Sequence, residues 1–175
     1  MARRTRTWPG PVASPATFSS TTGTVEAIYV AATAGEPAQA LQNVWAIAGQ
    51  GLEGDRHVVG AGTFPSFCPG SAPTLIEAEA CESFDPPLDA NEHCRNLVTR
   101  GIPLNGLVGR VFTIGQVRCR GMRLGEPCSV IQRYSAPTLV RPLVHRGGLR
   151  ADILTDGTVN IGDVIRVGDD AAIPS

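Results

Sequence analysis

The sequence contains no lysine, so each of its 15 cationic side chains is an arginine. Arginine keeps its charge at physiological pH and presents a planar fork of donors, which suits phosphates and carboxylates. The formal net charge is only −1, which argues against a strongly basic surface for nucleic acid. No run of about 18 apolar residues occurs, so we expect neither a transmembrane helix nor a membrane partner.

Cysteines are few, odd in number and irregularly spaced: Cys68, Cys81, Cys94, Cys119 and Cys128. This spacing argues against a disulfide framework, and the lack of a CxxC pair gives no support for a structural zinc or iron–sulfur site. We therefore expect a reducing, cytoplasmic compartment. Cys81 and Cys119 are predicted to lie in the core. His93 and Cys94 are chain neighbours that point to opposite faces of an extended chain, which weakens any interpretation of the two as a ligand pair.

The two ends of the chain are predicted to be tails. Residues 1–22 carry early arginines followed by proline, serine and threonine, without the apolar segment of a signal peptide. We favour a disordered tail over a targeting segment. Residues 169–175 are predicted to form a second flexible end. The remaining residues, 23–168, have the length of one domain with a hydrophobic core.

Short strand-like runs, 20 glycines and 14 prolines indicate a turn-rich β protein. The predicted strands are Thr24–Val30, Asn43–Ile47, Pro73–Ile76, Arg95–Thr99, Val111–Leu124 and Asp163–Val167. The predicted helices are Glu77–Phe84, the single turn Leu104–Val108, Ser129–Tyr134 and Thr138–Leu143. Many short strands with a few small helices predict a mostly β (α+β) domain that resembles a β-barrel.

Glycine and aspartate mark the turns of the predicted sheet. Leu149–Thr155 and Thr158–Ile161 flank Asp156-Gly157, a pair that favours a type I′ turn, so this region predicts a β-hairpin. Gly115 and Gly121 predict bends or bulges in the long extended stretch that contains them.

Cys128 lies where a strand is predicted to give way to a helix. Pro127 suits the first position of that helix, because its fixed φ is right and its missing N–H is not needed there. Cys128 would then lie in the first turn, near unpaired backbone N–H groups and the positive end of the helix dipole. Arg120 and Arg123 lie just upstream and add positive charge. These surroundings favour the thiolate, the form of cysteine that acts as a nucleophile or metal ligand.

Three further segments carry charge between glycines: Gly51–His57, Arg95–Gly101 and His145–Arg150. Taken singly, each has a plain structural interpretation: a solvated loop, surface charges at a strand end, and a helix C-cap that favours cations. His57 and His145 are equally compatible with structural histidines. Together, the segments place five arginines in glycine-flanked loops of a chain with a candidate thiolate, which favours a pocket for an anionic ligand.

These segments occur in an order that resembles a small stand-alone MOSC domain, the domain named for the C-terminus of molybdenum cofactor sulfurases. The motifs are Gly51–His57, Leu75–Ala80, Arg95–Gly101, Glu126–Cys128 and His145–Ala151. The resemblance covers roughly residues 23–168. It implies a mostly β, barrel-like fold and either binding of a molybdenum–pterin cofactor or transfer of sulfur. The family's reactive cysteine falls on Cys128, whereas Gly125 stands where many bacterial relatives have a second cysteine, which disfavours a two-thiol exchange.

The resemblance also implies roles for the charged residues. Cys128 is the expected molybdenum ligand and catalytic thiol, because dithiolene-bound molybdenum accepts a soft thiolate. The cofactor's terminal phosphate needs several donors, and the residues expected to bind the cofactor are Arg56, Arg95, Arg100, Arg123, His145, Arg146 and Arg150. Asp55, His57 and Asn96 are expected to supply protons or to orient the substrate. An association with pyridoxal phosphate binding comes from the family alone.

Relatives of this kind reduce N-hydroxylated compounds to amines, so the resemblance implies a molybdenum-dependent reductase of a small-molecule substrate. The chain has no GxGxxG motif, no Cys-rich cluster and no haem motif, and therefore needs a separate electron-donor protein. A second hypothesis is a sulfur carrier, in which Cys128 holds a persulfide received from a cysteine desulfurase. A third is a non-catalytic module that binds the cofactor or another anion. We favour the reductase over the carrier.

Overall fold

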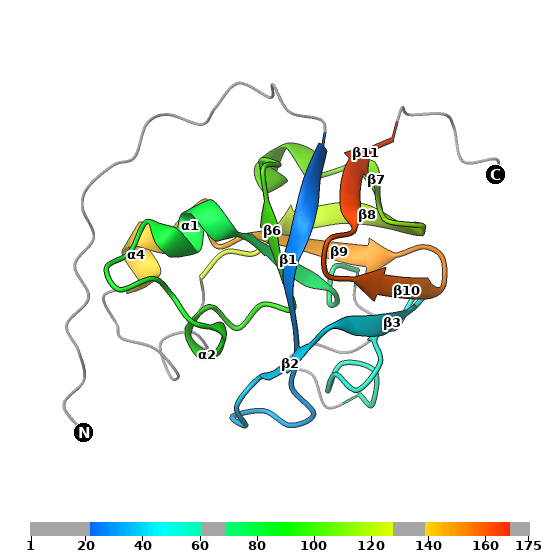
Figure 1. Ribbon diagram of the computed structural model, residues 1–175, viewed down its shortest axis with the longest axis horizontal. Helices are drawn as coiled ribbons and strands as arrows, with labels where there is room; N and C mark the ends of the chain where they lie inside the picture. The colour runs from blue at the N-terminus through cyan, green and yellow to red at the C-terminus, as the bar shows by residue number, and fades with distance from the viewer. Residues whose placement is uncertain (1–21, 61–68, 128–138, 169–175) are drawn as a thin grey trace.

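A closed barrel of seven β-strands forms the centre of the computed structural model, which describes residues 22–60, 69–127 and 139–168 (Figure 1). The strands are β1 (Thr22–Val30), β5 (Thr74–Glu77), β6 (Leu97–Arg100), β7 (Val111–Ile114), β8 (Val117–Leu124), β9 (Leu149–Ile153) and β11 (Val164–Val167). They follow the order β11-β7-β8-β9-β5-β6-β1, and β1 pairs with β11 to close the ring, while β2 (Gln39–Leu41) extends from β1 outside it. The prediction of a mostly β, barrel-like domain is confirmed.

The described barrel strands pair antiparallel, except that β5 and β6 run parallel with Leu75 opposite Leu97. A parallel pair needs a long crossover connection, which here carries the helices α1 (Ala78–Glu82) and α2 (Ala90–His93). The crossover returns the chain so that Asn96 N donates to Thr74 O at 3.0 Å. Polar residues that precede β6 therefore lie beside the start of β5.

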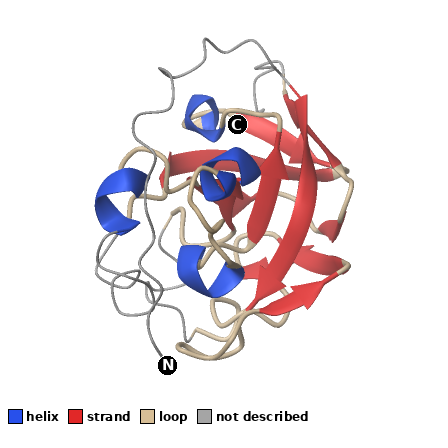
Figure 2. Ribbon diagram, turned by 60° about the vertical axis from the view of Figure 1, so that its left-hand side comes forward, coloured by secondary structure: helices blue, strands red, loops and turns tan. Residues whose placement is uncertain are grey.

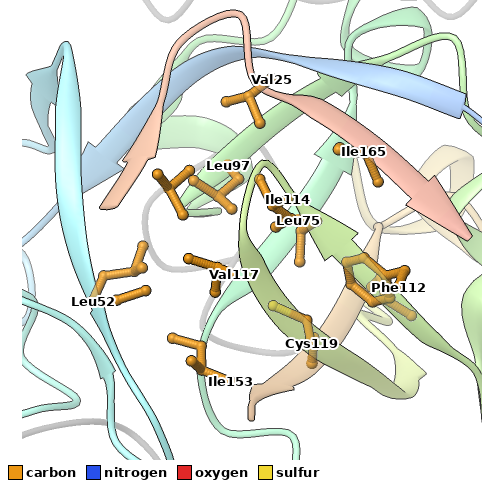
Figure 3. Close-up of a cluster of buried hydrophobic side chains, with 14 of the residues drawn as sticks. Val25, Leu52, Leu75, Leu97, Phe112, Ile114, Val117, Cys119, Ile153 and Ile165 are labelled. Carbon is orange, nitrogen blue, oxygen red and sulfur yellow. The ribbon is translucent and has the colours of Figure 1, made fainter. Parts of the chain in front are cut away.

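Apolar side chains fill the inside of the barrel (Figure 3). Because side chains alternate along a strand, Phe112 and Ile114 of β7 point inward, as do Val117 and Cys119 of β8. Each fully buried Leu, Ile or Phe contributes about 1.5–3 kcal/mol of transfer free energy. The interior is therefore the hydrophobic core, and Cys119 lies in it as predicted.

A small second sheet packs its apolar residues into the same core. It consists of β3 (Asn43–Ile47), β4 (Gly51–Leu52) and β10 (Gly157–Asn160), in the order β10-β3-β4. Val44, Leu52 and Val159 are buried and join the residues inside the barrel. The predicted strand Asn43–Ile47 is confirmed.

The short helices lie together on one side of the strands (Figure 2). α1 and α4 (Val140–Leu143) contribute to a second apolar cluster, in which Cys81 and Leu143 pack near Ile76 of β5. Ile76 follows the inward-facing Leu75 and therefore points out of the barrel towards these helices. The predicted core position of Cys81 is confirmed. None of the described helices is long and apolar enough to span a membrane.

The predicted hairpin around Asp156-Gly157 is wrong. β9 pairs with β8 and β5 in the barrel, whereas β10 pairs with β3 in the second sheet. The Asp156 side chain accepts a hydrogen bond from Ala48 N at 2.7 Å, which ties this turn to the end of β3. Strand partners from distant parts of the chain therefore override a favourable local turn sequence.

The predicted extended stretch from Val111 to Leu124 is two antiparallel strands, not one. Gly115 has a φ of +57° in the turn between β7 and β8, so the predicted bend is a full reversal of the chain. The predicted irregularity at Gly121 is confirmed by a register shift against β9. A Cβ on Gly121 would lie 2.1 Å from Leu107 O, so only glycine lets the 3-10 turn η1 (Leu104–Leu107) approach this strand.

Several predictions fall outside the described residues. They concern residues 1–21, Cys68, Cys128, the helix Ser129–Tyr134 and residues 169–175. Of the predicted helix Thr138–Leu143, the structure describes α4 from Val140 onward. The predicted helix at Glu77–Phe84 and the turn at Leu104–Val108 correspond to α1 and η1.

Candidate functional site

The outer face of the barrel brings together polar residues from three neighbouring strands. Thr74 of β5 lies opposite Arg150 of β9, which lies opposite Arg123 of β8. Leu149 and Ala151 point into the barrel, so the alternation along β9 turns Arg150 outward. The site is therefore built on strands whose inner faces are anchored in the core.

Asp55 is a buried carboxylate held by three N–H donors. Its Oδ1 accepts from His57 N at 3.1 Å, and its Oδ2 accepts from Ala31 N at 3.3 Å and from Asn96 Nδ2 at 2.9 Å. Only 4% of Asp55 is exposed, and the three donors offset the cost of burying its charge. Asp55 thereby fixes the loop after β4 against the end of β1 and the start of β6.

Asn96 uses both ends of its amide to join separate parts of the chain. Its Nδ2 donates to Tyr29 O at 3.2 Å and to Asp55, while its Oδ1 accepts from Thr74 N at 3.1 Å and from Thr74 Oγ1 at 3.0 Å. These four bonds use the full hydrogen-bonding capacity of the side chain. The structure therefore gives Asn96 and Asp55, both predicted to act in catalysis, protein partners that position the loop carrying His57.

His57 and Arg56 each bury a nitrogen atom that has no hydrogen-bond partner among the described residues. These atoms are His57 Nδ1 and Arg56 Nε. Burial lowers the pKa of His57; Asp55 opposes this shift, whereas Arg56 and Arg150 reinforce it. The imidazole is therefore neutral at neutral pH. A buried polar group left without a partner costs about 1–3 kcal/mol, which an anionic ligand oxygen would offset.

Gly70 brings the chain over the two arginines of β8 and β9. Its φ is +70°, and a Cβ built on it would lie 3.5 Å from Arg150 Cβ and 3.6 Å from Arg123 Nε. Gly70 N donates to Asp152 Oδ1 at 2.6 Å. Arg150 is buried and Arg123 is exposed. We call Arg56, His57, Arg123 and Arg150 the basic cluster.

Arg95 lies between two glycine-containing loops. Its Nε donates to Gly147 O at 2.8 Å and its Nη2 donates to Gly125 O at 2.6 Å. The side chain was predicted to bind the cofactor, and the structure directs two of its nitrogen atoms to main-chain carbonyls.

His145 and Arg146 lie on the segment that faces the Gly125 loop. The His145 N and Nδ1 atoms lie 3.0 Å and 2.8 Å from the Glu126 carboxylate, and the imidazole is exposed. Arg146 lies near the Glu77 carboxylate, whose pKa is raised chiefly by burial. Of these two predicted cofactor-binding residues, His145 therefore borders the chain that leads to Cys128, whereas Arg146 lies beside Glu77.

Arg100 is not brought to this site. It lies at the opposite end of β6 from Arg95, and its guanidinium pairs with the carboxylates of Glu26 and Glu82 on the exterior. Two carboxylates already neutralise this predicted cofactor-binding residue.

The described part of the site stops at Pro127, so the predicted thiol Cys128 lies outside it. Burial raises the pKa of both Cys81 and Cys119 to about 12, which keeps these thiols protonated at neutral pH. Cys94 is half-buried, and its Sγ donates to Asn91 O at 3.1 Å. Across residues 22–60, 69–127 and 139–168, no three His, Cys, Asp or Glu side chains gather to hold a metal ion.

Sequence analysis missed Thr74, His93 and Glu126 as residues that shape the site. Thr74 anchors the Asn96 amide, and Glu126 holds His145. His93 Nδ1 accepts from Arg95 N at 3.0 Å. The charge of Glu126, two residues before Cys128, could have indicated a site residue. Thr74 gave no such indication, because threonine is common in β-strands.

The fold and the site are those of a β-barrel domain with a basic cluster on its outer face. The MOSC domain family matches residues 72–166, more than half of the 175-residue chain. The chain belongs to the MOSC domain family, which is associated with molybdenum-cofactor binding.

Solved structures share this fold. YuaD from Bacillus subtilis is 21% identical with a TM-score of 0.67, and the match covers 83% of this chain and 95% of that chain. YiiM from Geobacillus stearothermophilus is 14% identical (TM-score 0.62; 84% and 75% covered), and YiiM from Escherichia coli is 15% identical (TM-score 0.57; 85% and 70% covered). Identities this low establish the fold alone. A comparison with curated proteins finds no match.

Proposed function

We propose that this MOSC domain binds a molybdenum–pterin cofactor on the outer face of the barrel and reduces N-hydroxylated or N-oxygenated small molecules. The observation that carries the proposal is the pair of buried nitrogen atoms, Arg56 Nε and His57 Nδ1, without partners among the described residues and close to Arg150. The family's association with the molybdenum cofactor supports the same ligand.

The residues present fit such a cofactor. Its terminal phosphate is a dianion, and the basic cluster offers guanidinium forks that match phosphate oxygens. Cys128 would provide the soft thiolate that molybdenum accepts. When bound, the cofactor supplies the two-electron chemistry that removes oxygen from the substrate.

The protein's own residues would prepare the site for that chemistry. Asp55 and Asn96 hold the loop of Arg56 and His57 in place through the hydrogen bonds described above. Burial keeps the His57 imidazole neutral. Its Nδ1 can therefore donate or accept one hydrogen bond, according to the tautomer, without adding a positive charge to the site. Arg56, Arg123 and Arg150 would bind and orient the anionic end of the ligand.

The reaction also defines the partners. Reduction of a hydroxylamine follows R–NHOH + 2 H⁺ + 2 e⁻ → R–NH₂ + H₂O, so the N–O bond breaks and oxygen leaves as water. The protons come from solvent and the electrons from a separate electron-donor protein, because the sequence has no motif for a nicotinamide, haem or iron–sulfur group.

Metal loading tests the proposal. The wild type, Cys128→Ser and the matched control Cys94→Ser are purified from a host that makes the cofactor. We expect molybdenum by elemental analysis, and pterin fluorescence after oxidation, in the wild type and Cys94→Ser, with molybdenum about tenfold lower in Cys128→Ser because the soft ligand is lost. Equal molybdenum in all three proteins would exclude Cys128 as the ligand. No molybdenum in any of them would exclude the reductase.

A sulfur carrier is the second candidate, and the position of Arg95 supports it as much as it supports the reductase. A buried guanidinium beside Gly125 puts positive charge near the segment that leads to Cys128, which favours a thiolate or a persulfide alike. Treatment with a cysteine desulfurase and cysteine would then add the mass of one sulfur atom to the peptide of Cys128. That gain, together with no molybdenum, supports the carrier over the reductase.

A further inference from the structure

Three arginines project from the outer face of the barrel on the strands β8 and β11. Thr113 of β7 lies opposite Arg118 of β8 on one side and opposite Arg166 of β11 on the other. These two arginines therefore stand two strand spacings, or about 10 Å, apart. Arg120 follows Arg118 by two residues on the same strand and faces the same way. We call Arg118, Arg120 and Arg166 the arginine face.

The arginine face has no carboxylate partner within the described part of the chain. Two of its members are exposed, and Arg120 is half-buried. Two carboxylates border it: Asp152, which lies opposite Arg120, accepts from Gly70 N, and Asp163, which precedes β11, accepts from Asn160 N. Like charges that gather without counter-charges repel one another, and a partner that carries carboxylates would relieve this repulsion.

The described helices leave this side of the barrel uncovered. Figure 1 shows α1, α2 and α4 on the left and β7 and β11 on the right, and α1 packs against β5 and β6. The exposed Val164 lies two residues before Arg166 on the same face of β11, so apolar surface adjoins the charges. Arginine is enriched in the interfaces between proteins, where it surrounds or joins apolar contacts. The surface is therefore suited to a protein partner.

The strand β8 connects the arginine face with the basic cluster. Its outward side chains continue from Arg118 and Arg120 to Arg123, which lies opposite Arg150 of β9. A protein seated on the arginine face would therefore lie beside the site proposed for the cofactor. The proposed reduction takes two electrons from a separate protein, which has to come close to that site.

The charge of the whole chain favours an acidic protein over a nucleic acid. The formal net charge is −1, and the exposed Glu26, Glu79 and Glu82 place negative charge on β1 and α1. A nucleic acid binds through many phosphate contacts over an extended surface and would be repelled by these carboxylates. A protein with a compact acidic patch needs to match the arginine face alone.

We propose that the arginine face is the docking surface for the electron-donor protein, which presents a patch of carboxylates to it. The inference rests on the proposed function, because it takes the partner to be the donor of that reaction. Docking itself needs no bound molybdenum and uses none of the residues proposed to bind the cofactor. A docking defect can therefore be told apart from failure of the reductase proposal.

Binding of oxidised electron carriers tests the docking surface. An acidic plant-type ferredoxin and an acidic flavodoxin, each with a fluorescent label, are titrated with the full chain. We expect the wild type to bind at least one of them, with a Kd that rises at least about tenfold between about 20 mM and about 200 mM salt. At low salt, the double variant Arg118→Gln/Arg166→Gln should bind at least about tenfold more weakly, because two charges that face the carboxylates are lost. No binding of either carrier, or an unchanged Kd in the double variant, would overturn the proposal.

Arg141→Gln is the matched control for the single variant Arg166→Gln, because it removes an exposed guanidinium from α4, away from the arginine face. We expect a wild-type Kd for Arg141→Gln and a Kd about threefold higher for Arg166→Gln. An equal loss in both variants would mean that net charge alone acts, and would overturn the proposal. If the double variant does not fold, as judged by circular dichroism, Arg166→Gln decides, and an unchanged Kd there overturns the proposal.

Two further probes separate the proposed partner from other anionic surfaces. They are vesicles of phosphatidylserine and phosphatidylcholine, and a DNA duplex. Binding to either that is tighter than binding to both carriers at the same salt, and that the double variant loses, would overturn the proposal. Molybdenum content, measured on the same preparations, should be equal in the wild type and the double variant. Lower molybdenum in the double variant would place these arginines in the cofactor site and would also overturn the proposal.

Discussion

Burial keeps the His93 imidazole neutral, and neutrality lets its Nδ1 accept the backbone N–H of Arg95. A protonated ring would carry N–H groups on both nitrogens and could no longer accept. The chain of contacts from His93 through Arg95 to Gly125 therefore depends on one uncharged ring. His93 therefore uses its Nδ1 to accept a hydrogen bond from a backbone N–H group.

At the residue scale, we expect His93 to make folding sensitive to acid. Its pKa falls from 6.5 in the unfolded chain to about 4 in the folded one, so below pH 6.5 the unfolded state binds more protons. The free energy of unfolding should decrease as the pH falls from 6.5 to about 4, by on the order of 3 kcal/mol. Urea unfolding across this range measures the effect.

The variant His93→Asn isolates this contribution, because it keeps an acceptor near the position of Nδ1 and does not titrate. We expect a smaller loss of stability between neutral pH and pH 4 than in the wild type. Gly168→Ala, which removes no titratable side chain, should keep the wild-type dependence. Identical curves for His93→Asn and the wild type would show that His93 does not govern acid sensitivity.

Residue types in the sequence singled out charged and polar positions but did not reveal their partners in the structure. Arg95, Asn96 and Asp55 were all predicted site residues, and the structure brings Asn96 into contact with Asp55. The Arg95 guanidinium, however, donates to Gly125 and Gly147, which lie 30 and 52 residues from it in the sequence. No local pattern reveals such contacts, so whether an arginine faces a ligand or a carbonyl could not be predicted.

At the element scale, two facing glycines set how closely the loops approach. A Cβ on Gly147 would lie 2.3 Å from Gly125 O, whereas a Cβ on Gly125 would lie 3.0 Å from Gly147 O. Neither glycine has a positive φ, so the difference reflects space rather than backbone strain. We expect Gly147→Ala to lower the free energy of unfolding by about 3 kcal/mol and Gly125→Ala by about 1 kcal/mol.

Urea unfolding of the two variants checks this order. Gly168→Ala is the control, since its nearest neighbour would lie 3.3 Å away and it stands outside both loops. A loss for Gly147→Ala no greater than that for the control would contradict the close packing of the loops. A Cβ on Gly125 would also lie 3.3 Å from Arg95 Nε, so this variant reports on the contact between the loop and the guanidinium as well.

The elements themselves were well predicted where apolar residues alternate, as in β1, β3 and β6. The hairpin at Asp156-Gly157 failed for a different reason. The sequence of a turn reports whether the chain can reverse, but the partner of each strand is decided by the core. Ile153 and Val159 both join the core from different sheets, and this outweighs a local pairing.

At the scale of the whole molecule, the barrel should unfold as one unit with β2 less protected. Every barrel strand has a partner on each side, whereas β2 pairs with β1 alone and has two exposed residues out of three. We expect the β2 amides to exchange with deuterium at least about tenfold faster than those of β7 and β8. Equal rates in hydrogen-exchange mass spectrometry would place β2 within the cooperative unit.

The ring closes through strands from opposite ends of the described chain, with Thr22 opposite Arg166. During synthesis, β1 therefore has to wait for β11 to leave the ribosome before this pair can form. Until then, the apolar inner faces of the earlier strands stay exposed, and we expect the unfinished chain to aggregate more readily than the closed barrel.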